Sequence, residues 1–303
     1  MTDRLALCIP LTAARIARLE AADLTVVGTQ GGGDCPDGFR TARFALGNPP
    51  ARWIAASPGL EWLQLESVGF GEYLSLPPGG PSVTNLAGLF ADPVAESALA
   101  GILALNRGID RLALVRKDAT WLGDDLRPEL RLLTGASLVL FGMGAINRRL
   151  AQLLTPFNCR ITAFHADWRP AALDAAVSQA DIVACAAPGI PTTSNVFDAR
   201  RLSALPTGAL FVNFGRGSLL DEGALAEALV GNRLRGAVID VTRDEPLPPD
   251  HPFWTAPRLI LTQHSGGGSS DETDRKIDVF LANLTRFRTG QALQGLVDFS
   301  KGY

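Results

Sequence analysis

Three charged residues follow predicted strands in the last third of the chain. Arg216 stands between two glycines after the run FVNF, Glu245 comes shortly after GAVID, and His264 closes LILTQ. In an open α/β sheet, ligands bind at the edge where strands end, so we expect the three to lie together. A guanidinium binds a carboxylate bidentately. An imidazole can donate a proton to a carbonyl oxygen while a carboxylate accepts a hydrogen bond from its second nitrogen. These are the groups that reduction of a 2-keto acid requires.

Each of these residues also has an ordinary structural interpretation. An arginine at a strand end can form a surface salt bridge, although the glycines beside Arg216 leave its surroundings open for a ligand. Asp240 and Glu245, taken alone, are more typical of solvated loop charges. His264, taken alone, could equally be a loop residue or an acid–base group.

A glycine motif lies upstream of these residues. In LVLFGMGAIN, residues 138–147, a predicted strand turns through two glycines into a predicted helix. The first glycine permits the tight turn, and the second lets the backbone approach a pyrophosphate whose charge the helix N-terminus stabilises. The motif's third glycine is replaced by Asn147, so helix and strand must pack around a side chain. The segment assigned to a dinucleotide cofactor comprises Gly142, Met143, Gly144, Ala145 and Ile146.

The second strand of this unit decides which nicotinamide cofactor is expected. An acidic residue about 20 positions beyond the glycines would bind the ribose hydroxyls of NAD, but that place holds His165. His165 and Arg169 together could hold a 2′-phosphate, so the sequence favours NADP(H) over NAD(H). Asp167 is the counter-evidence, because a shift of two residues restores an acid and NAD. Arg169 could also be an exposed charge at the start of a helix.

Six short apolar runs from residue 136 onward predict the strands that position these residues. They are SLVLF, RITAF, DIVAC, ALFVN, GAVID and RLILT, with helix-like segments such as EGALAEALV between several of them. Six is the strand count of a doubly wound dinucleotide-binding domain. The sequence therefore predicts an α/β fold with a parallel sheet in this part of the chain.

The first third of the chain predicts a smaller α/β unit. Strand-like runs occur at 5–9, 24–27, 52–56, 62–67 and 82–85, separated by Gly and Pro clusters. Asp92 as N-cap and Pro93 in the first turn predict one long helix after them. Near the C-terminus, Ser269 and Glu272 are spaced as in a capping box before a helix that reaches about Phe287.

Composition limits the classes of function. The 303 residues are 47% hydrophobic, carry a formal net charge of −3 and contain no Lys/Arg-rich block. Nucleic acid and anionic membranes are therefore not expected as partners, and small molecules are. Four scattered cysteines without metal-ligand spacing predict reduced thiols and no metal site. No long apolar run is present, and we expect a cytoplasmic location.

The order and spacing of GMGAIN, NFGRGSLLDEGAL, GAVIDVTRDEPLP and LTQH resemble the D-isomer-specific 2-hydroxyacid dehydrogenases over nearly the whole chain. Arg216 and Glu245 are 29 residues apart, and Glu245 and His264 are 19 apart, as expected of that family. The resemblance implies that these three residues are catalytic. It implies that Asp240 lies near the nicotinamide amide. Further cofactor contacts are implied for Pro188, Thr193, Phe214 and Gly266, and substrate contacts through the backbone amides of Val68, Gly69 and Phe70, besides Arg216.

Family architecture implies two Rossmann-like domains, with the dinucleotide-binding domain inserted in a smaller, flavodoxin-like substrate domain. We expect the substrate domain at 1–95, the dinucleotide-binding domain at 96–269, and a return helix and tail at 270–303 that pack on the first domain. The substrate would react in the cleft between the domains. Homodimerisation is usual in the family, and the helix from Pro93 is expected in part of the interface.

Within the family, the tail GQALQGLVDFSKGY and the phrase HPFWTAPRLILTQH are similar to the glyoxylate/hydroxypyruvate reductase branch, which favours NADPH. The chain departs from the family at Gln263, where proline is usual, at Asn147, and at Ser97, where a larger ring is frequent. Two alternatives on the same fold stay open: a formate or phosphite dehydrogenase, and a nucleotide-sensing corepressor. A short-chain dehydrogenase fails for want of a Tyr-x-x-x-Lys pair, and a serine hydrolase for want of G-x-S-x-G.

Overall fold

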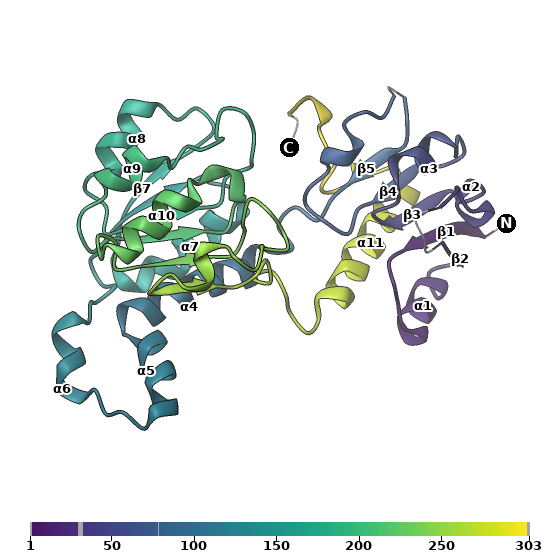
Figure 1. Ribbon diagram of the computed structural model, residues 1–303. Helices are drawn as coiled ribbons and strands as arrows, with labels where there is room; N and C mark the ends of the chain where they lie inside the picture. Colours follow the sequence, from purple (N-terminus) through teal and green to yellow (C-terminus); the bar gives the residue numbers. More distant parts are fainter. Residues whose placement is uncertain (1, 30–32, 78, 302–303) are drawn as a thin grey trace. The chain divides into compact units, whose positions relative to one another are not determined.

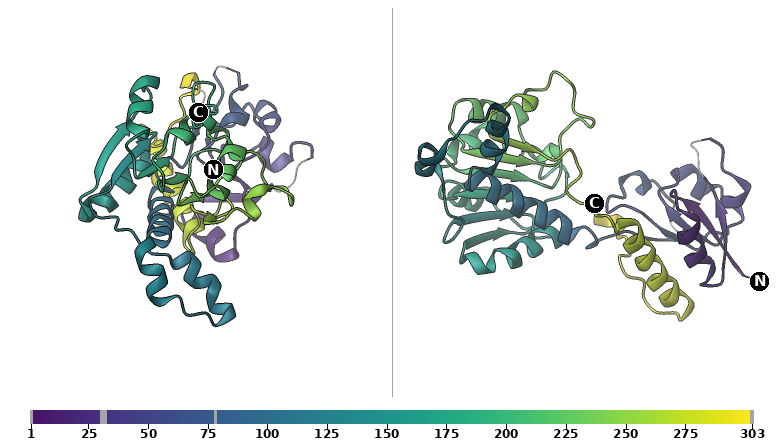
Figure 2. Two further views of the ribbon diagram at one scale, coloured as in Figure 1. Left: turned by 60° about the vertical axis from the view of Figure 1, so that its left-hand side comes forward. Right: turned by 90° about the horizontal axis from the view of Figure 1, so that it is seen from below.

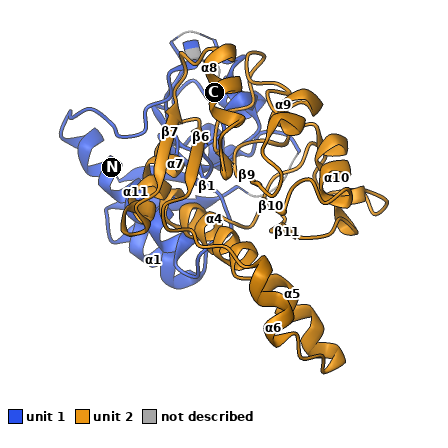
Figure 3. Ribbon diagram, turned by 90° about the vertical axis from the view of Figure 1, so that its left-hand side faces the viewer, with its two compact units in different colours: residues 1–89, 269–303 blue, residues 90–268 orange. Residues whose placement is uncertain are grey.

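The computed structural model describes residues 2–29, 33–77 and 79–301, and these form two compact units. Unit 1 comprises residues 1–89 and 269–303, and unit 2 comprises 90–268 (Figure 3). The divisions lie at 89/90 and 268/269, against the expected 95/96 and 269/270. The first differs because helix α4 (Ala91–Asn106) packs along its length on α7 and on the strands of unit 2. Each unit is described separately below.

Unit 1 is built on a five-stranded parallel sheet in the order β2-β1-β3-β4-β5, the flavodoxin-like arrangement. Its strands are β1 (Asp3–Cys8), β2 (Leu24–Gly28), β3 (Phe44–Gly47), β4 (Trp62–Gln64) and β5 (Ser82–Thr84). Its helices are α1 (Ala13–Glu20), α2 (Asp37–Arg40), α3 (Ala51–Ala55) and α11 (Glu272–Arg288). Residues of α1 and α11 pack on one face of the sheet and residues of α2 and α3 on the other. Figure 2 shows α11 as the yellow-green helix beside this sheet.

Unit 2 carries β7 and the helices labelled α4 to α10 in Figure 1. It is built on a six-stranded parallel sheet in the order β11-β10-β9-β8-β6-β7. The strands are β6 (Ser137–Phe141), β7 (Arg160–Phe164), β8 (Ile182–Cys185), β9 (Leu210–Asn213), β10 (Gly236–Ile239) and β11 (Leu259–Leu261). All six apolar runs predicted from the sequence are confirmed as strands.

Helices cover both faces of this second sheet. Besides α4, the covering helices are α7 (Ala145–Leu154), α8 (Pro170–Val177), α9 (Ala199–Ala204) and α10 (Glu222–Val230). Unit 2 also contains α5 (Ile109–Val115) and α6 (Gly123–Leu126). Residues of α4 and α7 form the core on one face, and residues of α8, α9 and α10 form the core on the other. Because β7 and β8 lie on opposite sides of β6, the chain reverses direction across the sheet at β6, and a crevice is expected where β6 and β8 end.

Four local predictions were wrong or incomplete. The run RWIAA is helix α3 and not a strand, because Pro50 is its N-cap and Trp53 and Ile54 are buried from one side of a short helix. Strand β3 was missed because its four residues are all buried and show no alternation. Helix α4 begins one residue before Asp92, with Phe90 as N-cap. At α11 the N-cap is Asp271, and Ser269 accepts the Glu272 amide only through its backbone oxygen, so no capping box forms.

Candidate active site

His264 and Glu245 form a direct pair in unit 2. The imidazole Nδ1 lies 2.7 Å from Glu245 Oε2, and the other carboxylate oxygen accepts the Thr242 amide at 3.0 Å. Burial raises the pKa of the Glu245 carboxyl, but the hydrogen bonds from His264 and Thr242 and the charge of Arg216 outweigh burial and lower the pKa overall. Glu245 is therefore a carboxylate at neutral pH, and Nε2 of His264 is left as the nitrogen that can meet a substrate.

The backbone that presents His264 is unusual. Gln263 and His264 have φ angles of +54° and +55°, in the left-handed region. The His264 amide donates to the carbonyl oxygen of Asp240 at 2.6 Å, which ties the segment to the end of β10. Proline fixes φ near −65°, so it could not occupy position 263 in this conformation. Gln263 thus suits the path that this chain takes into the histidine, and proline would not.

Arg216 stands on a turn that a buried asparagine holds. The Asn213 side chain accepts from the Gly215 amide and donates to the Arg216 carbonyl oxygen, both at 3.0 Å. The guanidinium is exposed, with one nitrogen donating to the Gly215 carbonyl at 2.7 Å. At Gly217 any side chain would clash with the backbone of Thr242. This close contact brings the Arg216 turn beside the loop that carries Glu245.

Asp240 is buried and organises the segment after His264. Its Oδ1 accepts the Thr262 hydroxyl at 2.6 Å and the Gly266 amide at 2.9 Å. The Ser97 hydroxyl donates to the carbonyl oxygen of Gly266 at 3.1 Å. A side chain at Gly266 would meet the ring of Phe214. Asp240, Phe214 and Gly266 are thus in one cluster, although they come from three different strand ends.

The glycine turn has the shape that a dinucleotide needs. Gly142 has φ +87°, and a Cβ there would lie 2.6 Å from the backbone of Ala187, so only glycine fits. Gly144 is the N-cap of α7, and a Cβ added to it would have no other atom within 4 Å, so the space beside it is open. The first helical hydrogen bond of α7 runs from the Arg148 amide to Gly144, so the preceding amides point out of the helix end, where an anion binds. The amides of Gly142 and Met143 donate to Phe164, so the amides of Gly144, Ala145 and Ile146 are the ones that would meet a pyrophosphate.

The candidate 2′-phosphate residues lie in a turn between β7 and α8. The Trp168 amide donates to the His165 carbonyl at 3.2 Å, and the Trp168 ring packs edge-on against Phe141. His165, Asp167 and Arg169 are exposed. Within the described part of the chain, none of these three side chains forms a hydrogen bond or ion pair. Arg169 is also the N-cap of α8, a position where the helix dipole disfavours a cation and favours an anion.

Two other predicted site segments are held by their own hydrogen bonds. The buried Thr193 hydroxyl donates to Pro188 O at 2.6 Å and accepts from the Ile190 amide, so it shapes the 188–193 loop. In unit 1, the carbonyl of Val68 accepts from Asn85 and that of Gly69 from Ser67. The Phe70 side chain is buried and packs against Phe299. No described residue accepts a hydrogen bond from the backbone amides of Val68, Gly69 and Phe70, so these amides could donate to a ligand.

A pocket of about 440 Å³ adjoins the His264–Glu245 pair. Apolar side chains supply most of its wall, and its lining residues are Asp240, Thr242, Glu245, Pro246, Leu247, Trp254, Leu261, Gln263 and His264. The contributions of Asn213, Thr242 and Thr262 were not predicted. A polar residue directly after an apolar strand run, as in LFVN and LILT, is the signal that could have revealed Asn213 and Thr262.

The described residues contain no group of His, Cys, Asp and Glu side chains arranged to hold a metal ion. Within the same residues, none of the helices combines the length and apolar character needed to span a bilayer.

Comparison with known proteins agrees with this geometry. The family model for the D-isomer specific 2-hydroxyacid dehydrogenase, NAD binding domain, matches residues 99–266, more than half of the chain. The glyoxylate reductase of Thermofilum pendens is 29% identical over 267 residues, covering 82% of this chain and 78% of the relative. The glyoxylate/hydroxypyruvate reductase A of Serratia proteamaculans is 28% identical over 243 residues, covering 76% and 74%.

Among solved structures, a D-isomer specific 2-hydroxyacid dehydrogenase family protein from Aeromonas salmonicida superposes with a TM-score of 0.83 at 26% identity. The match covers 99% of this chain and 100% of the other. The matched motifs, the sheet of unit 2 and the His264–Glu245 pair lead to one conclusion. This chain belongs to the D-isomer specific 2-hydroxyacid dehydrogenase family, whose members are NAD(P)-dependent oxidoreductases.

Proposed function

We propose that this protein reduces a small 2-keto acid, of the size of glyoxylate or hydroxypyruvate, to the D-2-hydroxy acid, with NADPH as the preferred reductant. The observation that carries the proposal is the 2.7 Å pairing of His264 Nδ1 with the Glu245 carboxylate, beside the turn that holds Arg216. The glyoxylate and hydroxypyruvate reductases among the relatives support the size of the substrate.

Each member of the triad has one task in this proposal. Glu245 fixes the ring of His264 through Nδ1, so that Nε2 faces the substrate and delivers a proton to its carbonyl oxygen. Arg216 binds the carboxylate of the 2-keto acid and polarises the ketone. When bound, the nicotinamide supplies the hydride. Asp240 positions the Gly266 peptide through its 2.9 Å hydrogen bond and would lie near the carboxamide of a bound nicotinamide.

The backbone amides of Val68, Gly69 and Phe70 are the proposed second anchor for the substrate carboxylate. Asn85 and Ser67 bind the carbonyl oxygens of this loop, which holds its peptide groups in a fixed orientation. Amide donors without a partner suit an anionic oxygen. Such hydrogen bonds go to the carboxylate and do not contact the rest of the substrate. The same amides can therefore bind a range of short 2-keto acids.

NADPH is preferred in this proposal because of the turn after β7. His165 stands where a ribose-binding acid would be, and Arg169 is an exposed cation at the N-terminus of α8. A 2′-phosphate would pair with Arg169 and would also interact favourably with the helix dipole. Asp167 is the residue that would favour NADH instead, because a carboxylate there can bind the ribose hydroxyls.

A homodimer and a cytoplasmic location complete the proposal. Helices α5 and α6 and their flanking loops, residues 107–135, form an arm that projects from unit 2 (Figure 3). The arm exposes Ile109, Leu112, Leu114, Trp121 and Leu132. Several exposed apolar side chains on one projecting segment are typical of a subunit interface, so a second copy is the proposed partner of the arm. The four free cysteines are compatible with a reducing compartment.

The test is turnover by the pure protein. NADPH and NADH are each mixed with glyoxylate, hydroxypyruvate, pyruvate, phenylpyruvate and branched 2-keto acids, and oxidation of the nicotinamide is followed by absorbance. We expect oxidation with glyoxylate or hydroxypyruvate, and a higher kcat/KM with NADPH. Dinucleotide binding without oxidation by any of these acids would overturn the proposal and favour a sensor on the same fold.

His264→Ala tests the proton donor in the same assay. We expect kcat to fall by about 10² or more while NADPH binds as before, because the ring acts on the substrate. His251→Ala is the matched control, since His251 also pairs with a carboxylate of unit 2, Glu222 at 3.2 Å. The kcat of His251→Ala should fall by at most a few-fold. Full activity in His264→Ala would show that another group donates the proton.

A further inference from the structure

Asn147, which stands in the third glycine position of the motif, is hydrogen-bonded to the glycine turn. Asn147 lies in the first turn of α7 and is 1% exposed. Its Nδ2 donates to the carbonyl oxygens of Phe141 at 3.0 Å and Gly142 at 3.1 Å, and lies 3.4 Å from that of Ala184. One side-chain amide therefore joins α7, the end of β6 and strand β8.

These carbonyls belong to the peptides that determine the shape of the turn. The amides of Gly142 and Met143 donate to the Phe164 carbonyl at the end of β7, at 3.0 and 3.2 Å. Phe141 O also accepts the Ala186 amide at 2.9 Å. The turn is thus held through its N–H groups by β7 and through its carbonyl groups by Asn147 and β8. The amides that follow, at the start of α7, are oriented by this arrangement.

A glycine at this position would allow the helix and strand to touch but would donate nothing from a side chain. Here the two strands at which the sheet order reverses, β6 and β8, are connected through the side chain of the helix that carries the anion-binding amides. Removing it takes this donor from the buried carbonyl of Phe141 and the half-buried carbonyl of Gly142, where a lost hydrogen bond favours a different peptide orientation.

We propose that Asn147 is a positioning residue for the cofactor: its amide fixes the Gly142–Gly144 turn so that the first amides of α7 face the pyrophosphate. This rests on the nicotinamide-dinucleotide part of the proposed function and is independent of the substrate. Because the pyrophosphate is common to both dinucleotides, loss of the amide weakens NADPH and NADH to the same extent.

The experiment measures dinucleotide affinity in the absence of any 2-keto acid, so it stands even if no substrate is found. In Asn147→Ala we expect Kd for NADPH and for NADH each to rise about tenfold, a factor that corresponds to one lost hydrogen bond of ordinary strength. Where a substrate is available, KM for the dinucleotide rises by a similar factor, and kcat at saturation stays within about twofold, because Asn147 does not touch the reacting atoms.

Asn283→Ala is the matched control. Asn283 is also fully buried, and its Nδ2 donates at 3.2 Å to Gln64 and 2.9 Å to Gln294, in unit 1. It should lower the melting temperature as Asn147→Ala does but leave both Kd values unchanged. Equal weakening by both variants would reduce Asn147 to a residue that only supports stability, and would overturn the proposal.

Asn147→Gly keeps the test informative should the alanine variant not fold, because glycine is the residue that the motif itself places there. We expect weaker binding of both dinucleotides in this variant as well. Parental affinity in a folded Asn147→Gly would mean that the side-chain amide is dispensable, and the proposal would be wrong.

Discussion

At the scale of single residues, uncharged polar side chains hold the charged ones in place. Asn213 bonds both ends of the Arg216 turn, and the Thr242 amide binds the Glu245 oxygen that His264 leaves open. Thr262 donates to Asp240. A catalytic group needs such support because a misplacement of about 1 Å is costly to the rate. The triad therefore depends on residues that carry no charge themselves.

Glu245→Gln tests the role of the carboxylate. Because the pKa of Glu245 is lowered in the folded protein, the residue is ionised throughout the neutral range, and the variant removes a full negative charge beside His264. We expect kcat/KM to fall by about 10–10², in the range of an acid–base group that has lost its support. Dinucleotide Kd should not change. Asp244→Asn, which neutralises the exposed neighbouring acid, should retain activity, and a similar loss in both variants would contradict a specific role for Glu245.

Arg169→Ser tests the choice of cofactor. Loss of one charge-assisted hydrogen bond corresponds to about 1.5–3 kcal/mol, so we expect Kd for NADPH to rise about tenfold or more, with little change for NADH. Asp167→Ser is the comparison. Should that variant weaken NADH while Arg169→Ser leaves NADPH unaffected, the cofactor would be NAD and Asp167 its ribose ligand.

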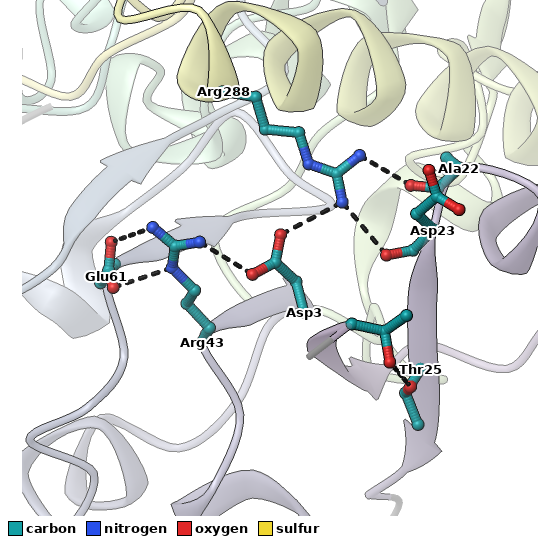
Figure 4. Close-up of polar contacts among 8 residues, drawn as sticks. Asp3, Ala22, Asp23, Thr25, Arg43, Glu61 and Arg288 are labelled. Atoms are coloured by element: carbon teal, nitrogen blue, oxygen red, sulfur yellow. Dashed lines mark hydrogen bonds and ion pairs between the residues drawn. The ribbon is translucent and has the colours of Figure 1, made fainter.

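At the scale of elements, α11 is fixed to unit 1 by packing at its centre and by charge at its end. Phe280 stacks on Trp62 with ring centroids 4.8 Å apart, and Ile277 and Leu284 are buried beside it. At the end of the helix, Arg288 donates to Asp3 and to the carbonyl oxygens of Ala22 and Asp23 (Figure 4). The helix belongs to unit 1 even though the whole of unit 2, residues 90–268, separates it in the sequence from the strands on which it packs.

The contact between Asp3 and Arg288 makes stability depend on pH. Burial raises the pKa of Asp3, but its bonds to Arg43 and Arg288 outweigh burial and lower it. Since the folded pKa lies below the unfolded value of about 3.9, the contact stabilises the folded chain above that pH and loses its effect as pH falls. We expect Arg288→Ala to lower the unfolding free energy by about 1 kcal/mol at neutral pH, and by less at a pH near 3.

Thermal unfolding of the variant at both pH values measures this difference. Arg286→Ala is the control on the same last turn, because the only hydrogen bond of the Arg286 side chain to the described residues goes to the Ala292 carbonyl at 3.3 Å. Its effect should not vary with pH. If Arg288→Ala lowered the unfolding free energy equally at neutral and acid pH, the ionised carboxylate of Asp3 would not be the partner through which Arg288 stabilises the fold.

At the scale of the whole molecule, the arm of residues 107–135 exposes apolar side chains that do not pack in the core of unit 2. The apolar face of α4 is used within unit 2, where Val94, Ala98 and Ile102 are buried. Trp121, in contrast, is 92% exposed and Leu114 is 66% exposed. The surface available to a second copy is therefore on the arm more than on α4, which was the element expected from the sequence.

Leu114→Asp tests the arm as an interface. We expect the parent chain to sediment at twice its mass of 32.1 kDa, and the variant to dissociate at micromolar concentration because a buried charge is costly in an apolar interface. Val230→Asp is the control, since Val230 is 65% exposed on α10, outside the arm. A parent chain that sediments as a monomer, or a Leu114→Asp variant that remains dimeric, would exclude this interface.

The sequence by itself determined the strands of unit 2, the glycine turn, and the pairing of His264 with Glu245. Each depends on a local pattern: an apolar run ends, and the residue after it lies at the edge of a parallel sheet. That rule places residues from distant parts of the chain together without knowledge of packing. The same rule predicted the α/β units, whereas the family was predicted from the resemblance of four motifs in their order and spacing.

Only the tertiary structure decided the features that depend on non-local contacts. RWIAA became a helix because unit 1 buries Trp53 and Ile54 there, and the four-residue β3 pairs with both β1 and β4. Asn147, a departure from the motif in the sequence, proved to be bonded to three carbonyl groups. Gln263 proved to have a backbone angle that proline cannot adopt. Such features follow from hydrogen-bond partners and backbone angles that no local pattern encodes.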